Sequence, residues 1–477
     1  MSSPFDISKL LSKKAQEKGL ESTELVTLTC REKISFVARL SFPGILSQIS
    51  TILMQYIDAA MVGHLGAGAS ASIGLVSSST WLISGFVNAL GTGFSIKCAH
   101  AVGEGQREKV KKILFQSIFF CSFFSLCISF LFSFLSRPLP LWLGASSDTA
   151  RDASSYFFVF VLSIPFFSLF YLLCGLLQSC GNMKAAGFVN IIMCFFDIAF
   201  NFLFIEVFSL GVTGAALGTC AAVFLSLLII AFYVFFSQLK KGGVFYCENK
   251  DKNGECKNLK KRFLFYPDFM LLKEAVKLAF PLALESCAFS GALVLVTRIV
   301  APLGDVALAS NSFATTAESL CYMMGYGIQE AATVLVGQST GARRKDLVKS
   351  FSKITVVAGI LLMTLSGLLM FFICPYVFSF LTDEVDVQKL SCRVLRIELF
   401  AEPLFAASIV ASGALRGMGD TLLPGIMNLC SIYIVRLLLS LFLVQSMGLE
   451  GIWIAMAVEL SFRGIIFLLR LAKKIKN

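Results

Sequence analysis

The chain has 477 residues, of which 56% are hydrophobic and 15% are charged, and its formal net charge is +11. A soluble protein of this length could not hide so much apolar surface, and apolar runs longer than about 18 residues are typical of membrane helices. The runs are also far longer than the roughly 10-residue strands of a membrane barrel, so we expect a polytopic α-helical membrane protein.

Residues 1–34 are polar and of mixed charge, with basic residues such as Lys13 and Lys14 beside acids such as Glu17 and Glu21. They lack the short apolar stretch that a cleavable signal peptide needs. We therefore expect a cytoplasmic tail.

Twelve apolar runs follow this tail in chain order. Their approximate bounds are 35–63, 69–96, 113–135, 154–180, 185–207, 211–237, 275–300, 307–336, 352–375, 391–415, 422–445 and 450–469. Spans four and ten contain Pro165 and Pro403. A proline inside a buried span predicts a broken, kinked or locally unwound helix.

The Lys and Arg residues outside the spans are distributed unevenly between alternate segments. The two termini and the even-numbered loops hold 30 of them, whereas the odd-numbered loops hold only Arg137, Arg151 and Lys389. The positive-inside rule then predicts a plasma-membrane protein with both termini in the cytoplasm. Because the 30 charges are spread over seven segments, we expect no nucleic-acid partner.

The sequence repeats itself at a constant offset, the one that separates Leu40 from Leu278. "LSFPGILSQ" at Leu40–Gln48 corresponds to "LAFPLALES" at Leu278–Ser286, and Pro165 corresponds to Pro403. Each repeat holds six spans, so both halves enter the bilayer in the same sense. The prediction is an all-α membrane protein whose two six-helix lobes are related by a pseudo-two-fold axis along the membrane normal.

This repeat divides the chain into four parts. We expect a tail at 1–34, an N-terminal lobe at 35–237, a cytoplasmic linker at 238–273 and a C-terminal lobe with a short tail at 274–477. Transporters place their sites near the midplane at such repeat interfaces.

Motifs of hydrolytic or nucleotide-driven chemistry are missing from the sequence: it has no HExxH, no phosphate-binding loop and no Ser/His/Asp set. Most of its 15 cysteines lie in apolar runs, where they act as small hydrophobes. Cys247 and Cys256 lie in the linker without further zinc ligands. We expect a non-enzyme without cofactor or metal, except possible Na⁺, that is driven by an ion gradient or by its substrate's gradient.

Three motifs resemble the multidrug and toxic compound extrusion (MATE) family. They are "IDAAMVGHLG" at Ile57–Gly66, "GVTGAALGT" from Gly211, and "ALRGMGDTLLP" at Ala414–Pro424. The resemblance implies export of cationic, amphipathic small molecules in exchange for inward H⁺ or Na⁺, by alternating access between the lobes. The expected partners are these substrates and the bilayer, and we expect a monomer to be functional.

Acids inside the spans are the candidate coupling groups, because an acid at the bilayer centre costs roughly 3 kcal/mol. Asp58 lies in span one, and Asp197 lies in span five with Asn201 one turn further on. In the DinF-like branch of the family, acids on these two spans respond to protonation or bind a cation. The resemblance therefore implies H⁺ or Na⁺ coupling at these three residues, and a structural role near a helix end is the alternative.

A second candidate cation site lies in the C-terminal lobe. Glu285, Glu318 and Glu402 lie on spans seven, eight and ten, and the NorM-like branch of the family surrounds a sodium ion with acids on those spans. Glu402 precedes Pro403, so it could instead bind backbone amides freed by a broken helix. Arg436, deep in span eleven, is expected to pair with an acid.

Polar residues in the spans are candidates for a substrate cavity, with helix packing by small residues as the alternative. The candidates are Gln48, Ser78, Asn88 and Asn311. Two other functions remain open. A lipid-linked precursor flippase of the same superfamily would usually have about fourteen spans, and a membrane receptor or scaffold would act through the tail.

Overall fold

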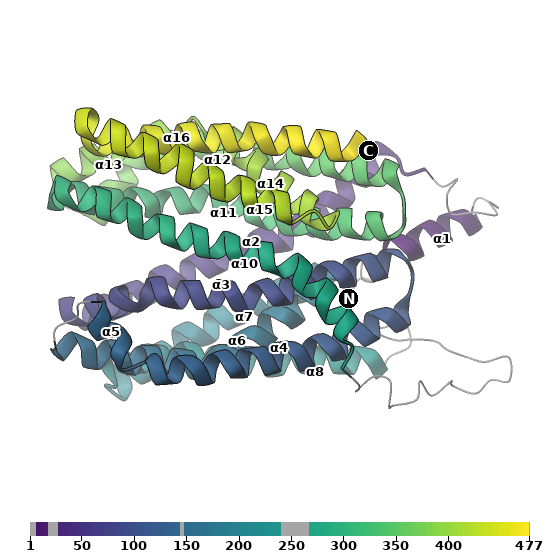
Figure 1. The fold of residues 1–477 in the computed structure, drawn as a ribbon, viewed down its shortest axis with the longest axis horizontal. Coiled ribbons are helices and arrows are strands. Elements are labelled where there is room, and N and C mark those ends of the chain that lie inside the picture. Colours follow the sequence, from purple (N-terminus) through teal and green to yellow (C-terminus); the bar gives the residue numbers. More distant parts are fainter. Residues whose placement is uncertain (1–5, 18–26, 144–146, 240–266, 383, 477) are drawn as a thin grey trace. The chain divides into compact units, whose positions relative to one another are not determined.

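The computed structural model describes residues 6–17, 27–143, 147–239, 267–382 and 384–476 (Figure 1). These residues are almost all helical and include no β-strand, which confirms the predicted all-α class. Most of the predicted linker, including Cys247 and Cys256, lies outside the described residues, so its structure is not discussed.

The first half of the chain forms α1, which precedes the repeats, and the helices of the first repeat. They are α1 (Ile7–Glu17), α2 (Cys30–His64), α3 (Ala67–Gly103), α4 (Arg107–Leu135), the short α5 (Pro138–Trp142), α6 (Ser147–Ser179), α7 (Met183–Asn201), the π-helix η2 (Phe202–Val207) and α8 (Gly211–Leu239).

The second half forms the helices of the second repeat. They are α10 (Phe269–Val300), the 3₁₀-helix η3 (Ala301–Leu303), α11 (Asp305–Gly341), α12 (Lys345–Leu381), α13 (Val385–Leu399), α14 (Glu402–Gly417), α15 (Leu422–Cys430), the π-helix η4 (Ser431–Leu437) and α16 (Leu438–Lys476).

Nine segments of the described chain are long and apolar enough to cross a membrane. The last of them, Leu422–Lys476, contains two of the predicted spans, which separate at Gly448, where φ is 57° and ψ is −133°. The other two predicted spans coincide with α11, which is rich in polar residues, and with the α13–α14 pair. The nine segments and the twelve predicted spans therefore describe the same helices.

By its internal contacts, the chain divides into two compact units. The first comprises Met1–Val26, Ser50–Ala283 and Gln338–Arg343. The second comprises Thr27–Ile49, Leu284–Gly337 and Arg344–Asn477. Helices α2, α10 and α11 therefore each contribute residues to both units.

Each unit has its own apolar core. Phe94, Leu114 and Phe170 are buried in the core of the first unit. Trp453 and Phe378 are buried in the core of the second. Many large apolar side chains outside these cores are exposed, for example Phe232 and Phe442, as expected for helices whose outer faces meet lipid.

The repeat-equivalent prolines Pro165 and Pro403 have different effects on their helices. Helix α6 continues through Pro165 without interruption, so the predicted break in span four is wrong. Membrane helices tolerate an internal proline when neighbouring groups satisfy the freed carbonyl. In span ten the helix does break: α13 ends at Leu399, and Pro403 lies in the first turn of α14, where a missing N–H costs nothing.

Close helix contacts follow the repeat. In the second unit, Gly44 of α2 lies directly against the backbone of Gly327 of α11. In the first unit, the residues at the equivalent positions, Leu282 of α10 and Ala89 of α3, pack together in a small buried cluster. In each of these two contacts, the first helix of one repeat packs on the second helix of the other repeat: α2 on α11, and α10 on α3.

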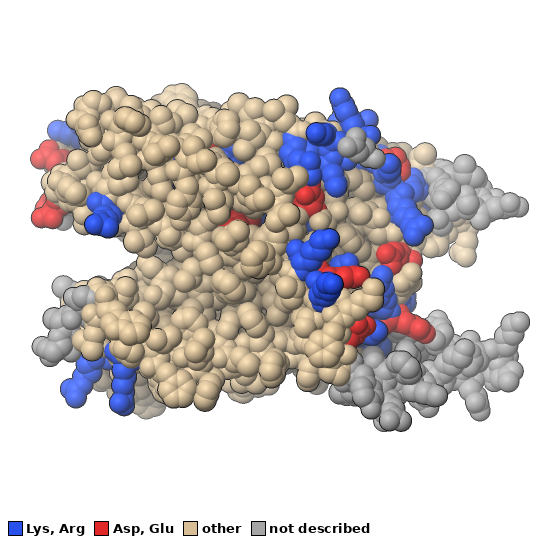
Figure 2. Space-filling view, in the orientation of Figure 1, with Lys and Arg blue, Asp and Glu red and all other residues tan. Residues whose placement is uncertain are grey.

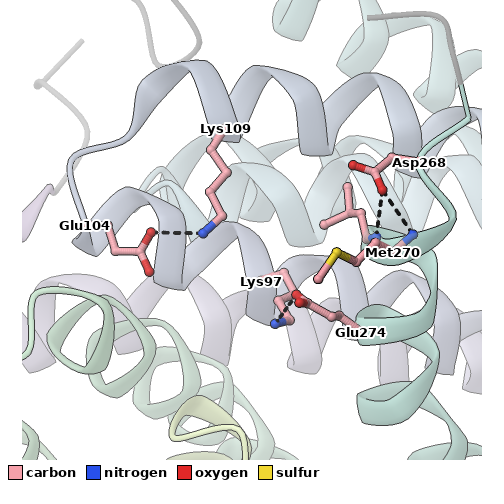
Figure 3. A network of polar contacts seen from close by, with 7 residues as sticks. Lys97, Glu104, Lys109, Asp268, Met270 and Glu274 are labelled. Atoms are coloured by element: carbon pink, nitrogen blue, oxygen red, sulfur yellow. Dashed lines mark hydrogen bonds and ion pairs between the residues drawn. The ribbon is translucent and has the colours of Figure 1, made fainter. Parts of the chain in front are cut away.

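Within each unit taken by itself, most of the Lys and Arg side chains in view in Figure 2 lie toward one end of its helices. Several of them pair with acids on neighbouring helices of the first unit (Figure 3). Lys97 lies 2.6 Å from Glu274, and Lys109 lies 3.0 Å from Glu104. Asp268 accepts hydrogen bonds from the first backbone N–H groups of α10, as a helix cap does.

Candidate functional site

Asp58, Asp197 and Asn201, from α2 and α7, meet inside the first unit. The Asn201 Nδ2 group donates one hydrogen bond to Asp58 Oδ1 at 2.8 Å and another to Asp197 Oδ2 at 3.1 Å. Asp197 and Asn201 are fully buried, and Asp58 is half-buried. The structure therefore brings the three predicted coupling residues together around one amide group, and we call them the amide-bridged pair.

Glycine and a π-turn position Asn201. A Cβ atom at Gly218 of α8 would overlap the Asn201 Oδ1 atom, so only glycine leaves room for this side chain. Directly after Asn201, helix α7 passes into η2, and π-turns within helices are frequent at functional sites. Gly218 belongs to the "GVTGAALGT" motif, so part of that motif has a direct packing role beside the pair.

The surroundings of the amide-bridged pair contain hydroxyl groups and a thiol but no cation. The two carboxyl groups lie within hydrogen-bonding reach of each other, and the Thr219 hydroxyl lies near Asp197. Tyr156 and Cys194 also face the two acids. In the described part of the chain, neither acid forms an ion pair with Lys, Arg or His, so its charge would be buried uncompensated.

Glu285 does not join the other two predicted acids of the second cation site. Its two carboxylate oxygens each lie 3.1 Å from Arg416 Nη2, and its Oε1 also accepts a hydrogen bond from Asn428 Nδ2 at 2.6 Å. Arg416 belongs to the "ALRGMGDTLLP" motif, whose Asp420 pairs with Arg470 at 2.6 Å. Both charged residues of this motif therefore hold helices together in the second unit.

Glu318 and Glu402 lie in one buried cluster with Glu398, at the break between α13 and α14. Both carboxylate oxygens of Glu398 and of Glu402 are buried without a hydrogen-bond partner among the described residues. The freed backbone amides bond elsewhere, for example Phe405 N–H to Ala401 O at 2.8 Å, so the structural use suggested for Glu402 is wrong. The sequence interpretation missed Glu398, although it lies four residues before Glu402.

Basic residues face this acid cluster from η4 and α16. Arg436 faces Glu459, Glu318 and Glu398, but its direct contact is with the Met456 sulfur at 2.7 Å. Arg463 lies 3.2 Å from Glu459. Arg436 is therefore near three acids without a close ion pair to any of them in the described structure, and no single acid is its partner.

The four predicted cavity residues have different surroundings. Gln48 donates a hydrogen bond to Glu330 at 2.8 Å, and Asn311 accepts one from the Trp453 indole at 3.0 Å. Asn88 is half-buried and Ser78 is exposed. Gln48 and Asn311 belong to the second unit, and Ser78 and Asn88 belong to the first. A role of these residues in substrate binding stays a prediction.

Twelve spans in two repeats, with buried acids and amides inside them, define a polytopic membrane transporter. The model of the MatE family matches this chain twice, over residues 43–203 and 281–442. The two matches together cover more than half of the chain, so the chain belongs to the MATE family that its motifs resemble. Their first residues, 43 and 281, are separated by the same offset as Leu40 and Leu278, which confirms the internal repeat.

Relatives cover nearly the whole chain. A probable multidrug resistance protein NorM of Thermotoga maritima is 26% identical over 443 residues, which are 90% of each chain. A protein of the same name from Streptococcus pneumoniae is 24% identical, covering 94% of this chain and 97% of that one. A MATE transporter of Vibrio cholerae, VcmN, was solved as a mutant; its structure matches with a TM-score of 0.84 at 17% identity, over 94% of this chain and 98% of that one. At that identity the likeness concerns the fold, and it supports the twelve-helix, two-lobe arrangement.

Proposed function

We propose that this protein is a secondary active exporter of small amphipathic cations that takes up H⁺ in exchange and couples at the amide-bridged pair. One observation carries the proposal: two acids from different membrane helices share one amide donor in a buried place without a cation. The names of the relatives support multidrug export. We propose H⁺ because two carboxyl groups within reach of each other can share a proton, and Na⁺ is the other outcome of the test.

The proposed mechanism rests on the cost of burying charge. Two ionised acids at this distance repel each other, and neither has a cation to offset its desolvation. A proton entering from outside neutralises one of them and favours the helix packing that buries the pair more deeply. Substrate is released outward in that packing. Loss of the proton to the cytoplasm restores the charge and the opposite packing, since a ligand shifts an equilibrium toward the state that binds it better.

The gradient supplies enough free energy for this exchange. Each unit charge that moves down a potential of 100 mV yields about 2.3 kcal/mol. Because about 1.4 kcal/mol corresponds to a factor of ten, one charge sustains an accumulation of tens-fold. Exchange of two protons for one monovalent cation moves one net charge inward and draws on this free energy, whereas a one-for-one exchange is electroneutral and is driven by the pH difference alone.

The orientation that we propose follows from the basic residues. Within each unit, most of the Lys and Arg side chains in view in Figure 2 lie toward one end of the helices, and the positive-inside rule assigns that end to the cytoplasm. Both termini are then cytoplasmic in a multi-pass protein of the cell membrane. We keep the division into tail, two lobes and linker as a proposal, and we propose that a monomer is sufficient.

Export from loaded vesicles tests the function and its coupling ion together. Purified protein is reconstituted, the vesicles are loaded with a lipophilic cationic dye, and pH and Na⁺ gradients are imposed separately. We expect dye flux with a pH gradient alone and none with a Na⁺ gradient alone. Dye flux with a Na⁺ gradient alone would show that Na⁺, and not H⁺, is the coupling ion. No flux under either gradient would contradict the proposed function.

A further inference from the structure

The α3 and α11 helices, which are second in their repeats, cross at a pair of equivalent glycines within the first unit. A Cβ atom at Gly103 of α3 would overlap the carbonyl oxygen of Gln338, and one at Gly341 of α11 would overlap that of His100. The two backbones therefore touch without side chains between them. Such a contact is tight when closed, but two glycines add no side-chain packing to hold it.

Gln338 connects this crossing to two other helices. Its Oε1 atom accepts a hydrogen bond from the Ile7 backbone N–H of α1 at 3.2 Å, and its Nε2 group donates to the Ser179 carbonyl of α6 at 2.8 Å. The Ser179 hydroxyl in turn donates to the Ser95 carbonyl of α3 at 2.7 Å. Gln338 is fully buried, so α1 helps to satisfy a side chain that would otherwise lose a partner at cost.

Helix α1 is amphipathic, and its apolar face is docked. Ile7, Leu11 and Ala15, spaced four residues apart, are buried, whereas Ser12 and Lys13 are exposed. This spacing places the three apolar side chains on one helix face. A helix as short as α1 is marginal in water when isolated, so the docked position and the helix stabilise each other.

The N-terminal end of α1 contacts the turn that follows α3. Ser8 lies against Gly105, which has a φ of 73° that favours glycine. Asp6 accepts a hydrogen bond from the Lys9 backbone N–H at 3.2 Å and faces Arg107, the first residue of α4. Cys180, just after α6, also faces Asp6. Helix α1 thus contacts α3 and α11, and Asp6 just before it faces the start of α4, at the end of α3 that we assign to the cytoplasm.

We infer that α1 is an intramolecular latch that holds the α3–α11 crossing closed and must leave it in each transport cycle. The inference rests on the proposed function, because alternating access requires the cytoplasmic ends of these helices to separate. The latch acts through Ile7 and Gln338 at the crossing and through Ser8 at the turn after α3. A change in the docking of α1 therefore changes the rate of export without changing the coupling acids.

A reversible cross-link tests the latch. In a background without native cysteines, Ser8→Cys and Gln106→Cys are joined by a short, reducible thiol cross-linker, because Ser8 lies beside Gly105, the neighbour of Gln106. We expect the cross-link to abolish dye export from loaded vesicles and reduction to restore it. Export at the same rate before and after reduction would overturn the latch. If the reduced double-cysteine variant exports no dye while the parent does, the cross-link is repeated with Lys9→Cys and Gln106→Cys. If the parent itself exports no dye, the proposed function fails instead of the latch.

A labelling experiment tests release without restraining the helix. The maleimide labelling rate of a single Ser8→Cys is compared with that of the exposed Ser12→Cys, at rest and during gradient-driven turnover. We expect turnover to raise the first rate and leave the second unchanged. Adding Leu11→Asp should raise the resting rate of Ser8→Cys about tenfold or more, since it removes a buried side chain from the docked face. Adding Ser12→Asp should not. Equal Ser8→Cys rates at rest and during turnover would contradict the inference.

Discussion

The two buried acid groups of this protein differ in how their charge is compensated. The amide-bridged pair in the first unit has two acids, one amide and no cation in the described structure. The cluster of Glu318, Glu398 and Glu402 in the second unit faces Arg436 and Arg463. A proton added to the amide-bridged pair neutralises a buried carboxylate that faces no cation. A proton added to the cluster neutralises a carboxylate that already faces Arg side chains. The first arrangement suits a site that must sense a proton.

Neither group is a copy of the other, although the chain is a repeat. At the offset of the repeat, Asp58 and Asp197 correspond to Val296 and Val435. In the opposite direction, Glu398 and Glu402 correspond to Phe160 and Ile164. The helix contacts therefore follow the repeat while the buried charges do not. A difference of this kind lets two similar lobes respond differently to one ion.

The largest expected effect comes from removing either acid of the pair. Asp58→Asn and Asp197→Asn each mimic the protonated state, so the protein should insert and fold but should not couple export to a gradient. Under an imposed difference of about two pH units the dye accumulation ratio should fall by about a hundredfold, which is the ratio that one proton exchanged for one monovalent dye cation sustains. It is measured in vesicles under an imposed gradient, at matched protein levels. The matched controls are Glu318→Gln and Glu402→Gln, which should retain more export than the pair variants. Export at the wild-type level in both Asp58→Asn and Asp197→Asn would contradict coupling at the amide-bridged pair and would favour a coupling site in the second unit.

The next effect concerns the cations of the cluster. Arg436→Met keeps the bulk of the side chain but removes one of the two positive charges that face Glu318 and Glu459. We expect a loss of about 3 kcal/mol in the free energy of unfolding, as when one member of a buried charge network is removed. Arg393→Ala is the control, since its pair with Glu450 is exposed and should cost less than about 1 kcal/mol. Thermal unfolding in detergent measures both, and equal shifts would show that the cluster does not depend on its cations.

A smaller effect should follow from the glycine beside the amide-bridged pair. Gly218→Ala places a methyl group where the Asn201 Oδ1 atom lies, so we expect a loss of about 1–3 kcal/mol from overpacking, together with weaker coupling. Gly74→Ala is the control, because a Cβ atom there has no atom within 4 Å, and in a helix the change should stabilise by about 0.5–1 kcal/mol. The two variants are compared by thermal unfolding and dye export. If Gly218→Ala exports dye with unchanged coupling, the position of Asn201 is not critical.

The smallest effect concerns Asp6, an acid outside the membrane spans that, unlike the pair, has a cation beside it. Burial raises the pKa of Asp6 from 3.8 to about 6, although Arg107 opposes the shift. Because this pKa is raised in the docked state, docking of α1 gains stability at low pH and loses it as the pH rises through about 6. We expect the docking equilibrium to weaken about tenfold between pH 5 and pH 7.

The labelling rate of Ser8→Cys, divided by that of Ser12→Cys at the same pH, reports this docking equilibrium. The division removes the pH dependence of the thiol reaction itself. Asp6→Asn should abolish the pH dependence that remains in this ratio of labelling rates. A ratio that does not change with pH in the parent would show that Asp6 has the same pKa whether or not α1 is docked.

The sequence predicted the helices and the repeat well, because long apolar runs and a fixed offset are local signals. It also predicted Asp58, Asp197 and Asn201 as one site, since acids in apolar spans are costly and few. It missed Glu398, and it did not predict that Glu285 pairs with Arg416 and Asn428, because spacing along a helix does not reveal which neighbouring helix supplies a partner. Arg416 lies just after predicted span ten, yet it pairs with Glu285 inside the second unit. The docking of α1 depends on Gln338, which lies in the other repeat, and no local pattern reveals such a contact.

The crossing of α3 and α11 has the form of an isologous interface within a single chain. Gly103 meets Gln338, and Gly341 meets His100; each residue and its counterpart are separated by the offset of the repeat, so the contact is made twice by equivalent residues. Two separate copies of a half-length chain would form the same contact about a two-fold axis. The fused chain, however, has His100 on one side and Gln338 on the other, and it is Gln338 that accepts a hydrogen bond from the Ile7 N–H of α1. Fusion thus permits a symmetric contact to be controlled from one side by a single segment, which a homodimer of identical halves could not achieve.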